Sequence, residues 1–388
     1  LGDVYKRQDY LYKKNPEGAN EIINKLESKY RQHIDELFAT PEYKQKGLEL
    51  IKSHFDYIRS YTKDLFTLFE EKVVLAQGEL ISTAMMNYYL QECGVKSVLL
   101  PALEYMRTDK NAEPDPVYIK DKLQVQLELH PDAEIYITQG YICRNAYGEI
   151  DNLQRGGSDY TASLIGAAIN ASEIQIWTDI DGMHNNDPRI VDKTAPVRHL
   201  HFEEAAELAY FGAKILHPTC IQPAKYANIP VRLLNTMDPT APGTLISNDT
   251  EKGKIKAVAA KDNITAIKIK SSRMLLAHGF LRKVFEIFES YQTSIDMICT
   301  SEVGVSVSID NVKHLNEILD DLKKYGTVTV DKDMCIICVV GDLEWENVGF
   351  EAKALDAMRD IPVRMISFGG SNYNISCLLY TSPSPRDA

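Results

Sequence analysis

The sequence predicts an α/β protein, in which a mostly parallel sheet is covered by helices and is followed by two ferredoxin-like (βαββαβ) units. Two observations carry this prediction. Up to about residue 250, apolar strand-like segments alternate with amphipathic helical segments, which is typical of a parallel sheet with helices on both faces. Beyond the polar linker 247–254, short segments follow the order strand, helix, strand, strand, helix, strand, and a second run of this order begins.

The first 250 residues are expected to begin with helices. Residues 17–38 and 46–71 carry apolar side chains at helical spacing. The segment 72–77 (Lys-Val-Val-Leu-Ala-Gln) is predicted to be a short strand, and 78–94 a helix that ends at a glycine. The elements expected after it are strands over 95–101, 133–142, 173–180 and 230–236, and helices over 115–131, 153–170, 202–213 and 220–229.

Domain boundaries follow from changes in these patterns. Residues 1–8 and 377–388 share no pattern with their neighbours and are expected to be extraneous to the fold. The α/β domain is then expected over 9–250, the first small unit over 255–334, and a truncated second unit over 335–376.

Composition excludes several classes of partner. Hydrophobic residues make up 44% of the 388 residues and charged residues 25%, which is ordinary for a globular protein. The net charge of −12 argues against a nucleic-acid surface, and no apolar run is long enough to cross a membrane. Seven scattered cysteines fit a reducing cytoplasm. Cys335 and Cys338 lie three apart on a predicted strand and so on opposite faces, which predicts no metal site there.

Polar motifs follow the predicted strands, where open α/β sheets bind ligands. Residues 138–141 (Thr-Gln-Gly-Tyr) end one strand, and Gly140 lets a ligand approach the backbone. Residues 155–159 (Arg-Gly-Gly-Ser-Asp) begin a helix, whose amino end can hold a phosphate or carboxylate. Alone, the two glycines would be an ordinary turn and Ser158 a helix cap.

A second polar segment, 177–189, follows the next strand. It offers the carboxylates of Asp179, Asp181 and Asp187, and Arg189 offers a planar fork for phosphate oxygens. Lys214 adds a positive charge further along. Each of these residues could instead be an ordinary turn or surface residue. Because these polar motifs follow successive strands of one predicted α/β domain, together they indicate a small-molecule kinase.

At this point the sequence resembles a known family. Five segments, in this order, are similar to aspartate kinase: 155–170, 176–191, 203–218, 228–236 and 241–247. Segments 279–289 and 294–310 resemble the first of the paired ACT domains of that family. The resemblance covers nearly all of 9–376. It implies an amino-acid-kinase-like sheet followed by two interleaved ACT units, an arrangement in which strand 255–262 can belong to the second unit.

The resemblance implies the reaction. ATP and L-aspartate, with Mg²⁺, give 4-phospho-L-aspartate and ADP, which is the first step towards lysine, threonine and methionine. The attacking carboxylate is already ionised at neutral pH and needs no general base. Catalysis therefore consists of alignment and charge neutralisation.

The family's site residues carry over to matching positions. Glu79 is expected to bind the ammonium group of aspartate and Arg155 a carboxylate, with Ser158 and Asp159 ordering the helix start. The residues expected to bind ATP are Thr178, Asp179, His184, Arg189 and Lys214, and those expected to act in catalysis are Arg155, Asp159 and Lys214. Two positions depart from the family: His184 stands where tyrosine is common, and Gln154 where glycine is common.

The regulatory expectation is that lysine binds to the first ACT unit at an interface between two chains and inhibits. The residues expected to hold it are Met274, Gly279, Phe280, Leu281, Asp296, Ser301 and Glu302. Carboxylates at Asp296 and Glu302 suit an extra ammonium group, and free N–H groups near Gly279 suit the α-carboxylate. An exposed sheet edge favours a homodimer or a higher oligomer. Threonine is the alternative effector.

One departure from the family concerns the start of the chain. Aspartate kinases begin with a strand that carries a Lys-Phe-Gly-Gly-Thr motif, and this sequence contains no such motif. We therefore expect the chain to lack its first strand and nucleotide loop, and to have low activity. Two other functions stay open: a non-catalytic, ACT-bearing regulatory subunit, and a kinase for another amino acid such as glutamate. The joint presence of Glu79, Arg155, Asp179, Arg189 and Lys214 favours the aspartate kinase.

Overall fold

The computed structural model describes residues 16–62, 66–154, 156–211, 216–249, 251–271, 278–343 and 348–380. The chain folds into two compact bodies. The N-terminal body comprises Leu1–Ile174 and Thr219–Ile229, and the C-terminal body comprises Gln175–Pro218 and Pro230–Ala388. Each body is described by itself.

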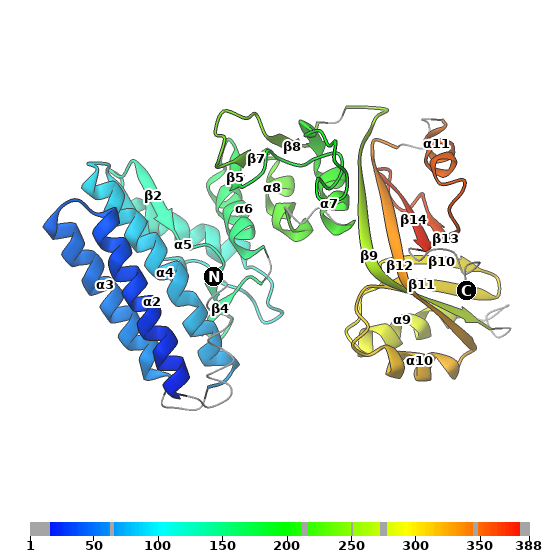
Figure 1. The fold of residues 1–388 in the computed structure, drawn as a ribbon, viewed down its shortest axis with the longest axis horizontal. Coiled ribbons are helices and arrows are strands. Elements are labelled where there is room, and N and C mark those ends of the chain that lie inside the picture. The colour runs from blue at the N-terminus through cyan, green and yellow to red at the C-terminus, as the bar shows by residue number, and fades with distance from the viewer. Residues whose placement is uncertain are drawn as a thin grey trace. The chain divides into compact units, whose positions relative to one another are not determined.

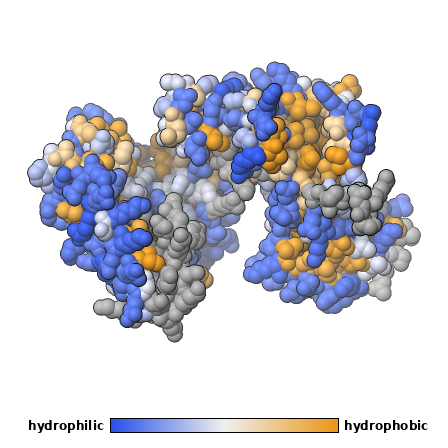
Figure 2. Space-filling model, in the orientation of Figure 1, coloured by the Kyte–Doolittle hydropathy of each residue, from blue (hydrophilic) through white to orange (hydrophobic). Residues whose placement is uncertain are grey.

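The N-terminal body begins with three long helices, which lie side by side in Figure 1: α2 (Pro16–Leu37), α3 (Pro41–Ser60) and α4 (Leu68–Glu92). Their apolar faces meet in one core, which includes Ile34, Ile51 and Phe55. The view in Figure 2 shows that the outward surface of this helical layer is mostly hydrophilic. Amphipathic spacing therefore predicted α2 and α3 correctly.

The strand predicted over 72–77 is wrong, because α4 runs through this segment. Thr67 caps the helix: its hydroxyl group accepts from the Phe69 backbone N–H at 3.2 Å, and Glu70 accepts from the Thr67 backbone N–H at 2.8 Å. Val73, Val74 and the residues one turn further on are then buried on one helix face. A short apolar run does not by itself distinguish a strand from a buried helical turn.

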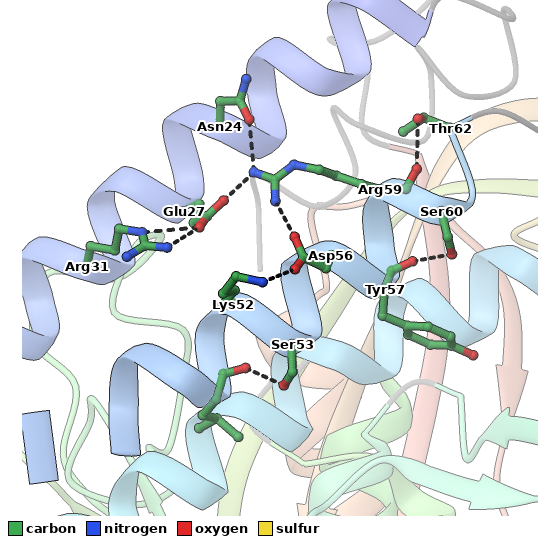
Figure 3. A network of polar contacts seen from close by, with 11 residues as sticks. Asn24, Glu27, Arg31, Lys52, Ser53, Asp56, Tyr57, Arg59, Ser60 and Thr62 are labelled. Atoms are coloured by element: carbon green, nitrogen blue, oxygen red, sulfur yellow. Dashed lines mark hydrogen bonds and ion pairs between the residues drawn. The ribbon is translucent and has the colours of Figure 1, made fainter. Parts of the chain in front are cut away.

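A polar network joins α2 to α3 (Figure 3). Arg59 forms an ion pair with Glu27 and donates to Asn24 at 2.9 Å, and Arg31 binds the same Glu27 carboxylate at 2.7 Å. Burial opposes ionisation of Glu27, but Arg59 and Arg31 outweigh it and lower the pKa of this carboxyl group. The network thus holds α2 and α3 together beside their shared apolar core.

The rest of the N-terminal body carries the first candidate motifs. β1 (Ser97–Leu100) pairs in parallel with β2 (Ile135–Thr138), and β3 (Ile142–Arg144) pairs antiparallel with β4 (Ile150–Asn152). The helices around them are η1 (Ala102–Glu104), α5 (Pro116–Glu128), α6 (Gly157–Ile169), η2 (Pro218–Ile221) and α8 (Gln222–Ala227). The single strand expected over 133–142 is divided, because Tyr141 takes a left-handed backbone conformation with φ of 70°.

The C-terminal body begins with a four-stranded sheet in the order β5-β7-β8-β6. Its elements are β5 (Ile174–Thr178), β6 (His199–His201), α7 (Phe202–Phe211), β7 (Val231–Asn235) and β8 (Thr244–Ser247). β6 and β8 are parallel, whereas β7 and β8 are antiparallel. The expected mostly parallel sheet is therefore replaced, among the described strands, by small sheets of both kinds. The connection 236–243 is too short for the crossover that a parallel β7–β8 pair would need.

A six-stranded antiparallel sheet follows, in the order β10-β11-β9-β12-β14-β13 (Figure 1). Its strands are β9 (Ile255–Lys270), β10 (Met297–Ser301), β11 (Gly304–Ile309), β12 (Thr327–Gly341), β13 (Val363–Ser367) and β14 (Asn374–Tyr380). Its helices are α9 (Phe280–Ser290), α10 (Leu315–Lys323) and α11 (Phe350–Ala357).

The two longest strands are shared between two repeats of this sheet. In the first repeat, residues 265–270 of β9 lie between β11 and residues 327–331 of β12. In the second repeat, residues 255–261 of β9 pair with residues 336–341 of β12, which also pairs with β14. The start of β9 therefore belongs by pairing to the second repeat, although it precedes the first repeat in the chain.

Helices cover one face of each repeat. α9 and α10 pack on Ile267 and Ile269 of β9, and Ala354 of α11 packs with Ile375 and Cys377 of β14. β14 continues to Tyr380. Regular secondary structure therefore extends into the segment 377–388, which was expected to be extraneous to the fold. No helix in the described ranges has the length and apolar character needed to cross a membrane.

Candidate functional site

The start of α6 is held against the turn that follows β2. An ideal Cβ atom placed on Gly140 would lie 3.0 Å from the Cα and Cβ atoms of Ser158, and one on Gly157 would lie 2.8 Å from the ring of Tyr141. Only glycine allows so close an approach at both points. The Tyr141 backbone N–H also donates to the Thr161 hydroxyl group at 3.1 Å. The structure thus brings together the two motifs predicted at 138–141 and 155–159.

The turn of α4 that carries Glu79 reaches the same region. The Thr83 hydroxyl group donates to the Glu79 backbone oxygen at 2.7 Å and accepts from the Gln139 side-chain amide at 2.8 Å. The carbonyl oxygen of that amide accepts from the Ala102 backbone N–H at 2.8 Å. Gln139 is buried, and it adjoins Gly140. Sequence reasoning missed Thr83 and Gln139, although the position of Gln139 at the end of a strand was a signal for it.

Two carboxylates at this junction, those of Glu79 and Asp159, are half-buried. Within the described residues, neither Glu79 nor Asp159 has an ion-pair or hydrogen-bond partner for its carboxylate, and burial raises the pKa of both carboxyl groups. Ser158 is exposed beside them at the start of α6. Arg155 lies outside the described residues. Half-buried acids without a protein cation are typical of a site that a cationic ligand group completes.

In the C-terminal body, Thr178 ends β5 and forms a local turn. Its hydroxyl oxygen accepts from the Ile180 backbone N–H at 3.3 Å. Asp179 is exposed, and in the described part of the chain its carboxylate has no partner. Asp181 differs, because it forms a bidentate pair with Arg198, with both N–O distances 2.9 Å. Arg198 lowers the pKa of Asp181, so this carboxylate has a structural role.

His184 and Arg189 have protein partners. The Nδ1 atom of His184 lies 2.9 Å from the Thr194 hydroxyl oxygen. The side chain of Arg189 is 69% exposed, and its guanidinium binds the Asp187 carboxylate through Nε at 2.9 Å and Nη2 at 2.6 Å. A phosphate at Arg189 would therefore replace a carboxylate. Lys214 lies outside the described residues.

Helix α7 connects this region to the six-stranded sheet at both of its ends. At its start, Glu204 accepts from Lys256 of β9 at 2.8 Å, and their side chains are 0% and 4% exposed. At its end, the Tyr210 hydroxyl group donates to Asp296 at 2.9 Å. Lys261 of β9 binds Asp296 at 2.7 Å and Asp310 at 2.8 Å. These contacts join the helix that precedes Lys214 to the strands that carry the regulatory motifs.

The pKa values in this cluster reflect its burial. Burial raises the pKa of Asp296, whose side chain is only 1% exposed, against the opposing effects of Lys261 and Tyr210. For the less buried Lys261, burial lowers the pKa, but the hydrogen bonds with Asp296 and Asp310 outweigh it, and the net shift is upward. The carboxylate of Asp296 is therefore already paired with a cation of the same chain, the ammonium group of Lys261.

Two carboxylates expected to bind the same effector, those of Asp296 and Glu302, lie at opposite ends of β10. Gly279, with φ of 81°, immediately precedes α9, which begins with Phe280 and Leu281. Ser301 ends β10 and Glu302 is exposed in the turn to β11. Asp296 precedes the other end of β10, about 17 Å away at the usual rise of a strand. The expectation that Asp296 and Glu302 share one ammonium group is not met within a single chain, and Met274 lies outside the described residues.

No group of three or more His, Cys, Asp or Glu side chains that could hold a metal ion occurs in the described ranges. Cys335 and Cys338 are both buried in β12.

Fold and site together define an amino acid kinase with a C-terminal ACT region. Residues 18–235 match the amino acid kinase family, and residues 337–382 match the ACT domain. Lysine-sensitive aspartokinase 3 of Escherichia coli (strain K12) is 34% identical over 318 residues, which cover 79% of this chain and 71% of that protein. The chain belongs to the aspartokinase family.

Two further comparisons agree. Aspartokinase 1, chloroplastic, of Arabidopsis thaliana is 36% identical over 332 residues, which cover 81% of this chain. The chain spans only 58% of the length of that plant relative. The crystal structure of E. coli aspartokinase III in complex with aspartate and ADP superimposes with a TM-score of 0.80 at 29% identity, covering 96% of this chain and 87% of that one.

Proposed function

We propose that this chain is an aspartate kinase, which transfers the terminal phosphoryl group of ATP to the side-chain carboxylate of L-aspartate. The products are 4-phospho-L-aspartate and ADP, and the reaction is the first step towards lysine, threonine and methionine. The observation that carries the proposal is the junction of α4, residues 139–141 and the start of α6, where the carboxylates of Glu79 and Asp159 have no hydrogen-bond or ion-pair partner among the described residues. The bound aspartate and ADP of the E. coli relative support it.

The amino-acid substrate would complete this junction. Glu79 binds the ammonium group, and Arg155 and the free N–H groups of the first turn of α6 bind a carboxylate. Ser158 and Asp159 lie in that first turn, where, among the described residues, neither side chain caps the helix, and both would contact the bound aspartate. The close contact between Gly140 and Ser158 fixes the position of the helix start relative to α4. The N-terminal body would thus offer a negative charge to the ammonium group of aspartate and positive groups to its carboxylate.

The nucleotide would bind to residues of the C-terminal body. Thr178, Asp179 and His184 contact ATP, while Arg189 and Lys214 bind its phosphates. Arg189 leaves Asp187 when a phosphate arrives, since both ligands need the same guanidinium fork. Mg²⁺ would be bound together with the phosphates, whose charge it would neutralise, and Asp179 offers an exposed carboxylate that could hold it. The aspartate carboxylate attacks in its ionised form, so the side chains align and neutralise charge rather than remove a proton.

Regulation would act through the ACT region. Lysine is the proposed effector, because the E. coli relative is named as lysine-sensitive. The start of α9 at Gly279 to Leu281 lies in sequence before the turn that carries Ser301 and Glu302, and these residues form the lysine site together with a second chain. β10 is an end strand of the sheet, and the part of its edge that β13 does not cover would pair with the second chain of a homodimer. A cytoplasmic location stays a prediction, because the plant relative is named as chloroplastic.

The activity is tested by measuring whether the chain forms ADP from ATP in the presence of aspartate. Glu79→Gln should raise the KM for aspartate at least tenfold and leave the KM for ATP nearly unchanged. Asp121→Asn, on the exposed face of α5, is the matched control and should leave both unchanged. Glutamate replaces aspartate in a parallel assay. ADP release that depends on glutamate instead, or no release together with tight lysine binding, would overturn the proposal, and the second result would favour a regulatory subunit.

The effector is tested by calorimetry with lysine, threonine and methionine. Lysine should bind, and Glu302→Ala should weaken it about tenfold, as expected for loss of a charge-assisted contact. Sedimentation at several protein concentrations should show a dimer. Threonine binding without lysine binding, or lysine binding that Glu302→Ala leaves untouched, would contradict this assignment.

A further inference from the structure

A hollow of about 450 Å³ lies on the helix-free face of the first repeat in the six-stranded sheet. Its floor consists of two rows of neighbouring residues on β9, β10 and β11. Lys268 pairs with Ser306, which pairs with Cys299, and Lys270 pairs with Gly304, which pairs with Ser301. Because side chains alternate along a strand, these rows face away from Ile267 and Ile269, which pack under α9 and α10.

β13 forms a wall of this hollow. Residues 363–366 line it, and the Cys299 thiol group donates to the Ile366 backbone oxygen at 3.2 Å. The two outermost strands of the sheet, β10 and β13, therefore approach each other, and the hollow lies between the two repeats inside the C-terminal body. A ligand there would contact both repeats at once.

The charged side chains that line the hollow are cationic. Lys268 and Lys270 line it, and in the described part of the chain neither has an ion-pair or hydrogen-bond partner. No acidic side chain is among the described residues that line it. Arg364 adds a third cation, whose Nε atom donates to Asp331 at 2.8 Å. Two unpaired lysines on neighbouring positions of one face repel each other, so an anion between them would relieve an unfavourable interaction.

We propose that this hollow binds a small metabolite that carries a phosphate group. The two ammonium groups neutralise the phosphate dianion as point charges, and the hydroxyl groups of Ser301 and Ser306 donate further hydrogen bonds. The volume is within the range of small-molecule sites and leaves room for a few carbon atoms beside the phosphate. This site shares Ser301 with the proposed lysine site, contains none of the residues proposed to bind the nucleotide, and does not depend on the kinase activity.

Gly304 provides a way to block the site without disturbing the fold. A Cβ atom placed there would lie 3.4 Å from the Ser301 hydroxyl oxygen and 3.9 Å from the Lys270 side chain, which are ordinary contacts, and its backbone is not left-handed. A larger side chain at 304 would therefore project into the floor of the hollow beside the two lysines.

The test is calorimetric titration of the full chain with inorganic phosphate and with glycerol 3-phosphate, at constant ionic strength. The parent protein should show saturable binding of glycerol 3-phosphate, and phosphate should compete with it. Lys268→Met and Lys270→Met should each weaken binding about tenfold, since each removes one charge-assisted contact. Gly304→Leu should abolish binding while the thermal unfolding midpoint stays near that of the parent.

Lys332→Met is the matched control, because Lys332 is an exposed lysine of β12 that does not line the hollow. It should bind both probes as the parent does. Succinate, a dianion without phosphorus, serves as the second control. Absence of saturable binding, binding that both lysine variants and Gly304→Leu leave unchanged, or binding of succinate in preference to both phosphates would overturn the proposal.

Discussion

The hydroxyl group of Tyr210 donates a hydrogen bond of 2.9 Å to Asp296, and this contact joins the end of α7 to the start of β10. The ammonium group of Lys261, which binds the same carboxylate, lies 4.6 Å from the centre of the Tyr210 ring. In the sequence, Lys214 follows the last residue of α7, Phe211, by three positions. We therefore expect a displacement of β10 by an effector to reach the residues proposed to hold the nucleotide phosphates.

Tyr210→Phe should weaken this connection without emptying the space that the ring fills. The variant loses one hydrogen bond and keeps the ring beside Lys261, so the free energy of unfolding should fall by about 1 kcal/mol. If the chain is inhibited by lysine, the concentration needed for half-inhibition should rise several-fold while kcat changes little. Urea unfolding and inhibition curves measure the two effects. Tyr226→Phe, at an 81% exposed position, is the control and should match the parent.

Glu204→Gln should destabilise the protein strongly. Glu204 and Lys256 are almost fully buried, and one oxygen of the Glu204 carboxylate has no partner among the described residues. Removing the negative charge leaves the lysine buried and unpaired, which costs about 3–5 kcal/mol. Urea unfolding followed by circular dichroism measures the loss.

The exposed pair of Arg282 and Glu286 on α9 provides the control for this variant. Glu286→Gln should change the unfolding midpoint very little, because exposed ion pairs contribute little to stability. A double variant, Glu204→Leu with Lys256→Met, should recover much of the loss. If Glu204→Gln were as stable as Glu286→Gln, the buried pair would not be what holds α7 to β9.

Gly140→Ala should impair aspartate binding. The added Cβ atom would meet the Cα and Cβ atoms of Ser158 at 3.0 Å, so the start of α6 has to move away. The KM for aspartate should rise several-fold, while that for ATP should change less. Gly78→Ala, next to Glu79 in α4, has open space around the new atom and should instead stabilise the helix by about 1 kcal/mol. Equal effects of both variants on aspartate would contradict the contact with α6.

Glu79→Gln should make the fold more stable at neutral pH. Burial raises the pKa of Glu79 above its ordinary value of 4.5, so the folded state binds this proton more tightly than the unfolded state does. The stability contributed by the protonated acid is therefore present at low pH and is lost as the pH rises through the raised pKa. Glutamine avoids that loss. Unfolding midpoints measured at several pH values should be higher for Glu79→Gln than for the parent at pH 7. This difference should disappear below pH 4.5, the ordinary pKa of glutamate.

The same pKa shift predicts the pH dependence of substrate binding. Only the ionised Glu79 attracts the ammonium group of aspartate, so the KM for aspartate should rise as the pH falls through the raised pKa of Glu79. The rise should begin at a higher pH than an ordinary glutamate would give. In Glu79→Gln the KM should be high and nearly independent of pH over this range. A profile that is identical in both proteins would show that Glu79 does not contact the substrate.

Local sequence signals predicted much of this fold and part of the site. Helical spacing identified α2 and α3, and the two glycine-containing motifs at 138–141 and 155–159 identified segments that the structure brings into contact. The helical turn at 72–77 was missed, because its apolar residues fit the spacing of a buried helix as well as that of a strand. The antiparallel pairing of β7 with β8 was also missed, since only the length of their connection distinguishes it from the parallel alternative.

Residues distant in the chain account for the errors at the regulatory region. Asp296 looked like a free carboxylate for an effector, but Lys261, 35 positions earlier, occupies it. Its pairing depends on how β9 and β10 align across β11, which no short pattern encodes. The hollow beside β13 likewise depends on the two ends of the sheet approaching each other, and its lysines are ordinary strand residues in the sequence.

The sharing of β9 and β12 between the two repeats limits how the regulatory region can be produced as a separate polypeptide. Expression of 255–334 alone would leave residues 255–261 without the β12 residues that hydrogen-bond to them, as an apolar, aggregation-prone tail. Expression of 335–380 alone would lack the strand that β12 pairs with on its other side. The smallest fragment that keeps every strand paired runs from 255 to 380, so limited proteolysis should release that fragment whole rather than as halves.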